Sequence, residues 1–125
     1  MANITLAVPS KVPGGLEAAV DQHFGHCGVY TLVDVDDNGV TAVRTVENVP
    51  HKEGSCLVSV QHLADNGVTA LLAGGMGRNP LMGFQQKGIE VFFAGGFPTV
   101  GMAVQAYLEK RLPEFSADQT CKGHH

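Results

Sequence analysis

The order of the secondary-structure elements is decided mainly by residues 68–99, which read VTALLAGGMGRNPLMGFQQKGIEVFFAGGFPT. Two short apolar runs, at 68–73 and 89–94, have the length and composition of buried strands. Each run continues into Gly-Gly and then into a segment that favours a helix. Two consecutive strand–helix units predict parallel strands joined by right-handed crossovers. Because both strands are largely apolar, we expect helices on both faces of the sheet.

Capping residues and apolar stripes indicate where the helices lie. Asn79 is a typical N-cap, with Pro80 in the first helical position and Gly88 just past the end. Thr99 is expected to cap the final helix, and Asn66-Gly67 to end an earlier one. The apolar stripes of the first and last helices comprise Cys56, Val60, Leu63 and Ala64, and Val100, Ala103, Val104, Tyr107 and Leu108.

The first part of the chain predicts a three-stranded antiparallel meander. Its strands are expected at residues 4–8, 29–35 and 40–46. Pro9 is expected to end the first strand, and the Asn38-Gly39 pair to form the hairpin turn within 36–39. The candidates for the inner face of the third strand are Val40, Ala42 or Val43, and Val46.

Together the elements run βββαβαβα, which predicts a three-layer α/β/α sandwich around a five-stranded mixed sheet. A chain of 125 residues is typical of one domain. We expect that domain over residues 1–112, followed by a loose tail at 113–125.

Composition excludes several classes of function. The net charge is −4 and the eight Lys and Arg residues form no basic run, so we expect no nucleic-acid partner. No apolar stretch approaches the ~20 residues of a membrane span, and the first residues do not resemble a secretory signal, so a cytoplasmic protein is expected. Three cysteines without a Cys-x-x-Cys pair predict no disulfide framework.

The predicted topology brings four loops to one edge of the sheet, at residues 9–27, 47–54, 74–79 and 95–99. Ligands of open α/β sheets bind outside the carboxyl ends of the parallel strands. Glycine turns allow a close backbone approach, and helix starts offer unpaired N–H groups, so two such turns predict an anion site. The alternative is that the glycines only make tight turns. No P-loop or G-x-G-x-x-G pattern supports nucleotide binding.

The residues expected to bind the ligand at this edge are Lys11, His23, Phe24, His51, Gly74, Gly75, Met76, Gly77, Arg78, Asn79, Gly95, Gly96 and Phe97. In addition, His26 and Cys27 lie in the cluster His23-Phe24-Gly25-His26-Cys27. Two histidines three apart beside a thiol are able to ligate copper(I), zinc or iron. An equally open interpretation is a surface loop that Phe24 anchors in the core. Cys56 is expected to be a buried thiol, and Cys121 to emerge at the opposite edge.

The segments that carry a family resemblance are residues 4–8, 23–25, 74–77 and 88–91, together with His51 and Gly54. In this order and spacing they resemble the dinitrogenase iron–molybdenum cofactor biosynthesis family, over residues 2–112. The chain looks most like the orange-protein branch of anaerobic bacteria. The resemblance implies a ribonuclease-H-like fold and a pocket, containing His23 and His51, for an anionic metal–sulfide cluster. The cluster contains molybdenum, with copper or iron.

The resemblance implies a carrier and not an enzyme. Sulfide already satisfies the metals of such a cluster, so amide groups, Arg78, Lys11 or Lys52 and protonated His are expected to hold its charge non-covalently. A cluster donor or acceptor protein is the expected partner. The alternatives are a cluster-free interaction or sensor module of the same fold, and a metal-dependent nuclease. The nuclease is disfavoured because Asp34, Asp36 and Asp37 are expected at the opposite edge.

Overall fold

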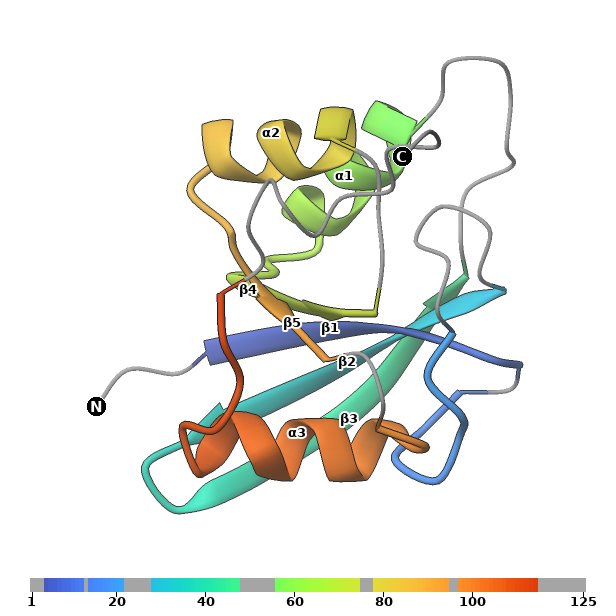
Figure 1. The fold of residues 1–125 in the computed structure, drawn as a ribbon. Coiled ribbons are helices and arrows are strands. Elements are labelled where there is room, and N and C mark those ends of the chain that lie inside the picture. Colours follow the sequence, from blue (N-terminus) through green and yellow to red (C-terminus); the bar gives the residue numbers. More distant parts are fainter. Residues whose placement is uncertain are drawn as a thin grey trace, which may run out of the picture.

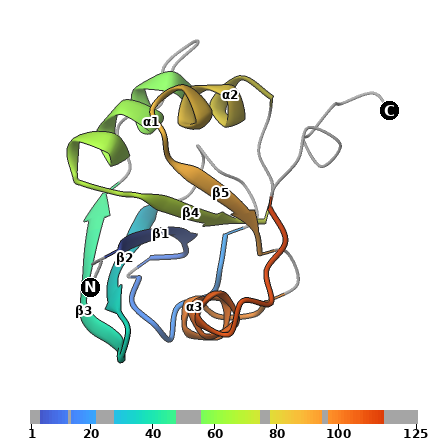
Figure 2. The ribbon, with the colours of Figure 1, turned by 90° about the vertical axis from the view of Figure 1, so that its left-hand side faces the viewer.

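A computed structural model describes residues 4–12, 14–21, 28–47, 56–74, 78–94 and 97–114. Figures 1 and 2 show three layers, with α1 and α2 on one face of a sheet and α3 on the other. The helices are α1 (Cys56–Asp65), α2 (Arg78–Gln86) and α3 (Val100–Leu108). The strands are β1 (Ile4–Ser10), β2 (Val29–Asp36), β3 (Gly39–Glu47), β4 (Ala70–Ala73) and β5 (Glu90–Phe93).

The five strands form one mixed sheet in the order β3-β2-β1-β4-β5. The first three pair antiparallel, while β4 pairs parallel with both β1 and β5. In the described residues the elements follow one another as βββαβαβα. The predicted α/β class and mixed five-stranded sheet are therefore confirmed. The ribonuclease-H-like label stays a prediction.

Alternating side chains of the central strands fill a separate core on each face of the sheet. In β1, Ala7 belongs to the core beneath α1 and α2, which also contains Leu63 and Phe84. Its neighbours Leu6 and Val8 belong to the core beneath α3. Because successive residues of a strand point to opposite faces, strands between two helical layers are apolar at nearly every position. This requirement explains the apolar runs that identified the strands.

The first strand continues past the proline that was expected to end it. Pro9 pairs with Tyr30 and Ser10 with Val29, so the predicted end of the strand was wrong by two residues. Proline is tolerated where a strand has a neighbour on only one side. Here β4 pairs with β1 only at Leu6 and Ala7, so the last residues of β1 have β2 alone as a partner strand.

The third strand is the edge of the sheet, and the prediction of its inner face was largely wrong. Val40 and Val43 are 43% and 40% exposed, and Ala42 is also exposed. Among the candidates only Val46 packs against a core, and it does so half-buried. Most apolar side chains of this edge strand have no layer that buries them, so alternation alone did not locate the core. Gly39 has φ +120° and follows the two turn residues at 37–38.

The helix boundaries agree with most capping predictions. The Thr99 side chain accepts a hydrogen bond from Met102 N at 3.3 Å, as an N-cap should. Gly67 and Gly88 take φ of +82° and +76° after their helices. However, α2 begins at Arg78, so Asn79 is its second residue and not its N-cap, and Pro80 is its third residue and not its first. That position still lies in the first turn, where a missing N–H costs no helical hydrogen bond.

The start of the predicted tail pairs with the last strand of the sheet. Pro113 O accepts a hydrogen bond from Phe93 N at 2.9 Å, and Glu114 forms a bridge with Phe92. The first two residues of the predicted tail therefore pair with β5, and residues 115–125 lie outside the described part.

None of the helices described is both long and apolar enough to cross a membrane.

Candidate functional site at the carboxyl ends of the parallel strands

The ends of β1, β4 and β5 meet at one edge of the sheet, which we call the carboxyl edge. It lies on the right-hand side in Figure 1. The last residue of β3 and the first residues of α2 and α3 lie there too. Lys11 and Gly74 come directly after β1 and β4, and Arg78 and Asn79 open α2. The described candidates are therefore placed at the edge where ligands of such sheets bind.

A buried pair of hydroxyl groups holds the loop after β1 against the sheet. Ser10 and Thr31 are fully buried, and their side-chain oxygens lie 2.8 Å apart. Ser10 Oγ donates to Val8 O at 2.6 Å, so the Thr31 hydroxyl donates to Ser10. The Thr31 oxygen in turn accepts from Gly15 N at 3.0 Å. The network joins the carboxyl edge to residues 14–21, which belong to the loop predicted at residues 9–27.

The start of α3 does not offer the free amide groups that the sequence predicted. Val100 N donates to Ala18 O at 2.9 Å, and Gly101 N donates to Leu16 O at 2.8 Å. The third amide of the helix, from Met102, is taken by the Thr99 cap. All three N–H groups that lack a helical acceptor are therefore bonded to the protein. The prediction of a second helix mouth for the anion was wrong in this respect.

Glycine explains how the loop comes so close to α3. A Cβ atom built on Gly101 would lie 3.1 Å from Leu16 O, which is tighter than ordinary contact. Ala19 and Thr99 also form a β-bridge, so residues 16–19 run along the helix start. Carbonyl groups of the loop therefore accept the hydrogen bonds that the α3 amides were expected to donate to a bound anion. This long-range contact has no signal in the local sequence.

Lys11 lies at the carboxyl edge but already has a counter-ion. Its Nζ is 3.8 Å from Asp21 Oδ2, with the lysine side chain 63% exposed and the aspartate side chain 10% exposed. The backbone holds this arrangement, because Lys11 N donates to Ala19 O and Asp21 N donates to Pro9 O. A neighbouring carboxylate offsets the attraction of an ammonium for an anion. Lys11 is therefore a weaker anion ligand than its position alone indicates.

The other candidates divide into those that the structure places and those that it leaves out. Phe97 is half-buried and packs against the core beneath α3. For Arg78 and Asn79 the structure gives the helical backbone position. Gly74 is half-buried at the end of β4. The predicted site residues that lie outside the described part are His23, Phe24, His26, Cys27, His51, Gly75, Met76, Gly77, Gly95 and Gly96.

Within the described ranges, no group of three or more His, Cys, Asp or Glu side chains is arranged to hold a metal ion. The carboxylate of Asp34 lies at the edge opposite to the carboxyl edge. It accepts hydrogen bonds from Arg44 at 3.2 Å and from the Thr5 hydroxyl at 2.8 Å. His62 Nε2, in α1, lies 3.1 Å from Glu47 O at the end of β3. This contact ties α1 to the carboxyl edge.

Comparison with known proteins gives a family match over most of the chain. A family model described as "Dinitrogenase iron-molybdenum cofactor" matches residues 4–110. A curated but uncharacterised protein of Methanocaldococcus jannaschii is 25% identical over 95 residues, which is 74% of this chain and 80% of that protein.

Solved structures of similar proteins show the same fold. The apo form of the orange protein from Desulfovibrio gigas is 29% identical, with a TM-score of 0.76, over 90% of this chain and 92% of that one. A Thermotoga protein, which has been proposed to be a NifB protein, is 30% identical, with a TM-score of 0.72, over 90% of this chain and 97% of that one. The domain described above therefore shares its fold with these two proteins.

Proposed function

The chain belongs to the dinitrogenase iron–molybdenum cofactor family, and we propose that it binds and carries an anionic, molybdenum-containing metal–sulfide cluster at the carboxyl edge. The observation that carries this proposal is the arrangement of that edge in a member of this family. Gly74 after β4, the start of α2 and Lys11 all lie at this edge. We propose a non-covalent carrier without a catalytic role, with copper or iron as the second metal.

The start of α2 is the part of the carboxyl edge best suited to the anion. The amides of α3 are bonded to Leu16, Ala18 and the Thr99 cap, so the proposal rests on α2, which begins at the same edge with Arg78. Since Pro80 has no N–H, the first turn of α2 offers backbone donors from Arg78 and Asn79. The Arg78 guanidinium adds charged donors at the positive end of the helix. We therefore propose that the site is centred on the turn at 74–77 and not between the N-termini of α2 and α3.

The histidines and the cysteine of residues 23–27, together with His51, are proposed to complete the site. Sulfide bridges satisfy the metals of such a cluster, so the protein needs to supply charge and shape more than a full ligand set. His26 and Cys27 remain candidates for direct contact with a soft metal such as copper(I). A donor or acceptor protein would load or unload the cluster, and this edge would then be the surface that it approaches.

The test is to purify the protein without oxygen, add tetrathiomolybdate and copper(I), remove unbound metal, and measure molybdenum content and the visible spectrum. We expect bound molybdenum and a sulfide-to-metal absorption band. A colourless chain that retains no molybdenum would contradict the carrier and favour the cluster-free interaction or sensor module.

Variants locate the site. Arg78→Glu is expected to reduce molybdenum retention about tenfold or more, since a charge-assisted hydrogen bond contributes about 1.5–3 kcal/mol. Lys87→Glu is the matched control, because it makes the same charge change just beyond the opposite end of α2. Cys121→Ser is expected to have little effect. Equal retention by all three variants would place the cluster elsewhere.

A further inference from the structure

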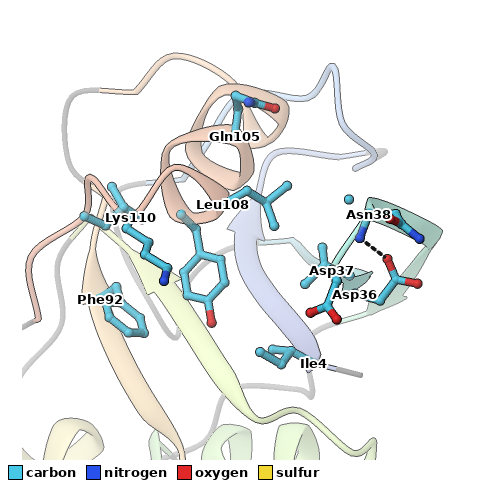
Figure 3. Close-up of a pocket in the computed structure, with 12 residues that line it drawn as sticks. Ile4, Asp36, Asp37, Asn38, Phe92, Gln105, Leu108 and Lys110 are labelled. Carbon is cyan, nitrogen blue, oxygen red and sulfur yellow. Dashed lines mark hydrogen bonds between the residues drawn. The ribbon is translucent and has the colours of Figure 1, made fainter. Parts of the chain in front are cut away.

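A cavity of about 690 Å³ opens at the edge of the sheet opposite to the carboxyl edge. It lies between the end of α3 and the hairpin that joins β2 to β3 (Figure 3). On this face α3 is the one helix of the described residues, whereas two helices cover the other face. A cavity of this size is in the usual range for small-molecule sites. Since β1 alone spans about 20 Å, the cavity is well separated from the proposed cluster site.

One wall of the cavity is apolar and carries an aromatic pair. Phe92 and Tyr107 meet edge to face, with ring centroids 5.3 Å apart and ring planes at 75°. Ile4 and Leu108 also line the cavity (Figure 3). Aromatic and branched side chains of this kind bind the apolar body of a ligand and, through their ring faces, attract cations.

The opposite wall carries negative charge. Asp36 and Asp37 lie on the hairpin, and Figure 3 shows them across the cavity from Lys110. Asp36 Oδ1 accepts from Asn38 N at 2.7 Å, so this carboxylate also shapes the turn. The carboxyl end of α3 adds the partial negative charge of a helix terminus. With two carboxylates and one ammonium in its lining, the cavity favours a cation on the hairpin side.

Lys110 has an unusual backbone for its residue type. Its φ of +61° is left-handed, and within the described ranges every other residue with positive φ is glycine. Lys110 N donates to Tyr107 O and Arg111 N to Ala106 O, both at 2.9 Å, which is the hydrogen-bond pattern of a glycine-type helix end. A lysine there keeps a strain that glycine would remove, and strain of this kind is often found at functional sites. Unlike a glycine, Lys110 contributes a charged side chain to the cavity lining.

We infer that this cavity binds a small organic amine, with its apolar or aromatic body against Phe92 and Tyr107 and its ammonium group beside Asp36 and Asp37. Lys110 repels the ammonium from the far wall and so fixes the orientation of the ligand. The site requires one cationic end and a body of modest size. It is independent of the cluster, which carries the opposite charge and binds at the other edge of the sheet.

The experiment is a titration of the ¹⁵N-labelled protein with phenethylamine, followed by amide chemical shifts. We expect saturable shifts at residues 36–39 and 105–112, and weaker binding of the neutral analogue 2-phenylethanol and of the anion 3-phenylpropionate. Equal shifts with all three compounds, or no amine-induced shifts in these residues, would overturn the inference.

Two variants should change the amine affinity in opposite directions. Asp37→Asn is expected to raise the Kd about two- to fivefold, because exposed charge pairs contribute little more than that. Lys110→Asn removes the repelling charge with a residue that tolerates the left-handed conformation, and is expected to lower the Kd by a similar factor. Glu47→Gln, at the other end of β3, is the charge-matched control and should leave the Kd unchanged. A change of the same sign in both cavity variants would contradict the proposed orientation.

Discussion

The hydroxyl network beneath the carboxyl edge makes a testable contribution to stability. In Thr31→Val, a methyl group replaces a fully buried hydroxyl of nearly the same volume, so no cavity forms. Gly15 N–H loses its acceptor at 3.0 Å, and Ser10 Oγ loses a partner at 2.8 Å while keeping its bond to Val8 O. A part-buried donor left without a partner costs about 1–3 kcal/mol, and the new methyl group returns up to about 1 kcal/mol. The net expectation is a loss of about 1–2 kcal/mol.

Urea unfolding followed by circular dichroism measures this loss as a lower midpoint with an unchanged slope. The matched control is Thr45→Val on the edge strand, where the same change on an exposed side chain is expected to stay within about 0.5 kcal/mol. A double-mutant cycle with Ser10→Ala should give a coupling of about 0.5–1 kcal/mol, since the two oxygens are in contact. If Thr31→Val is as stable as the wild type, the network does not hold the loop and the reasoning fails.

Three further outcomes are expected elsewhere in the fold. Lys110→Gly should raise the free energy of unfolding by about 0.5–1 kcal/mol, because glycine adopts φ of +61° without strain; Lys110→Ala, which keeps the strain, should not. Thr99→Ala should lower it by about 1 kcal/mol through loss of the N-cap of α3, measured by the same urea titration. Burial and, secondarily, the charge of Glu90 raise the pKa of Tyr107 above its usual 10.0. Because the folded-state pKa of this neutral acid is raised, its contribution to stability is fully present below about pH 10 and falls as pH rises further. Ultraviolet titration should show that Tyr107 ionises at a lower pH in Glu90→Gln than in the wild type.

The central strands and the caps could be predicted because their signals are local. Strands such as β4 are apolar at every position since both of their faces are covered, and this pattern is visible in the residues themselves. The cap at Thr99 similarly depends on residues within one helical turn. From these elements the parallel arrangement of β4 and β5 followed, and with it the edge at which Lys11 and Arg78 lie.

The remaining features depend on contacts between residues far apart in the chain. Nothing near Val100 indicates that Ala18 O will accept its amide hydrogen bond, so the closed start of α3 was not predictable. The exposure of Val40 follows from the place of β3 at the sheet edge, which the local alternation does not encode. The cavity, likewise, exists because α3 ends opposite the β2–β3 hairpin, a juxtaposition that only the tertiary structure creates.

The two edges of the sheet carry different charges, and this difference would direct the two proposed ligands to different edges. At the carboxyl edge, Arg78 opens α2 at its positive end, where the cluster is proposed to bind, and Asp21 lies beside Lys11. At the opposite edge Asp36 and Asp37 lie beside the negative end of α3. A metal–sulfide anion would be repelled by those carboxylates, and an amine would be repelled by the start of α2. Each proposed ligand therefore has one edge that attracts it and one that rejects it, so phenethylamine should leave molybdenum retention unchanged. Competition between the amine and the cluster would show that one of the two sites has been misplaced.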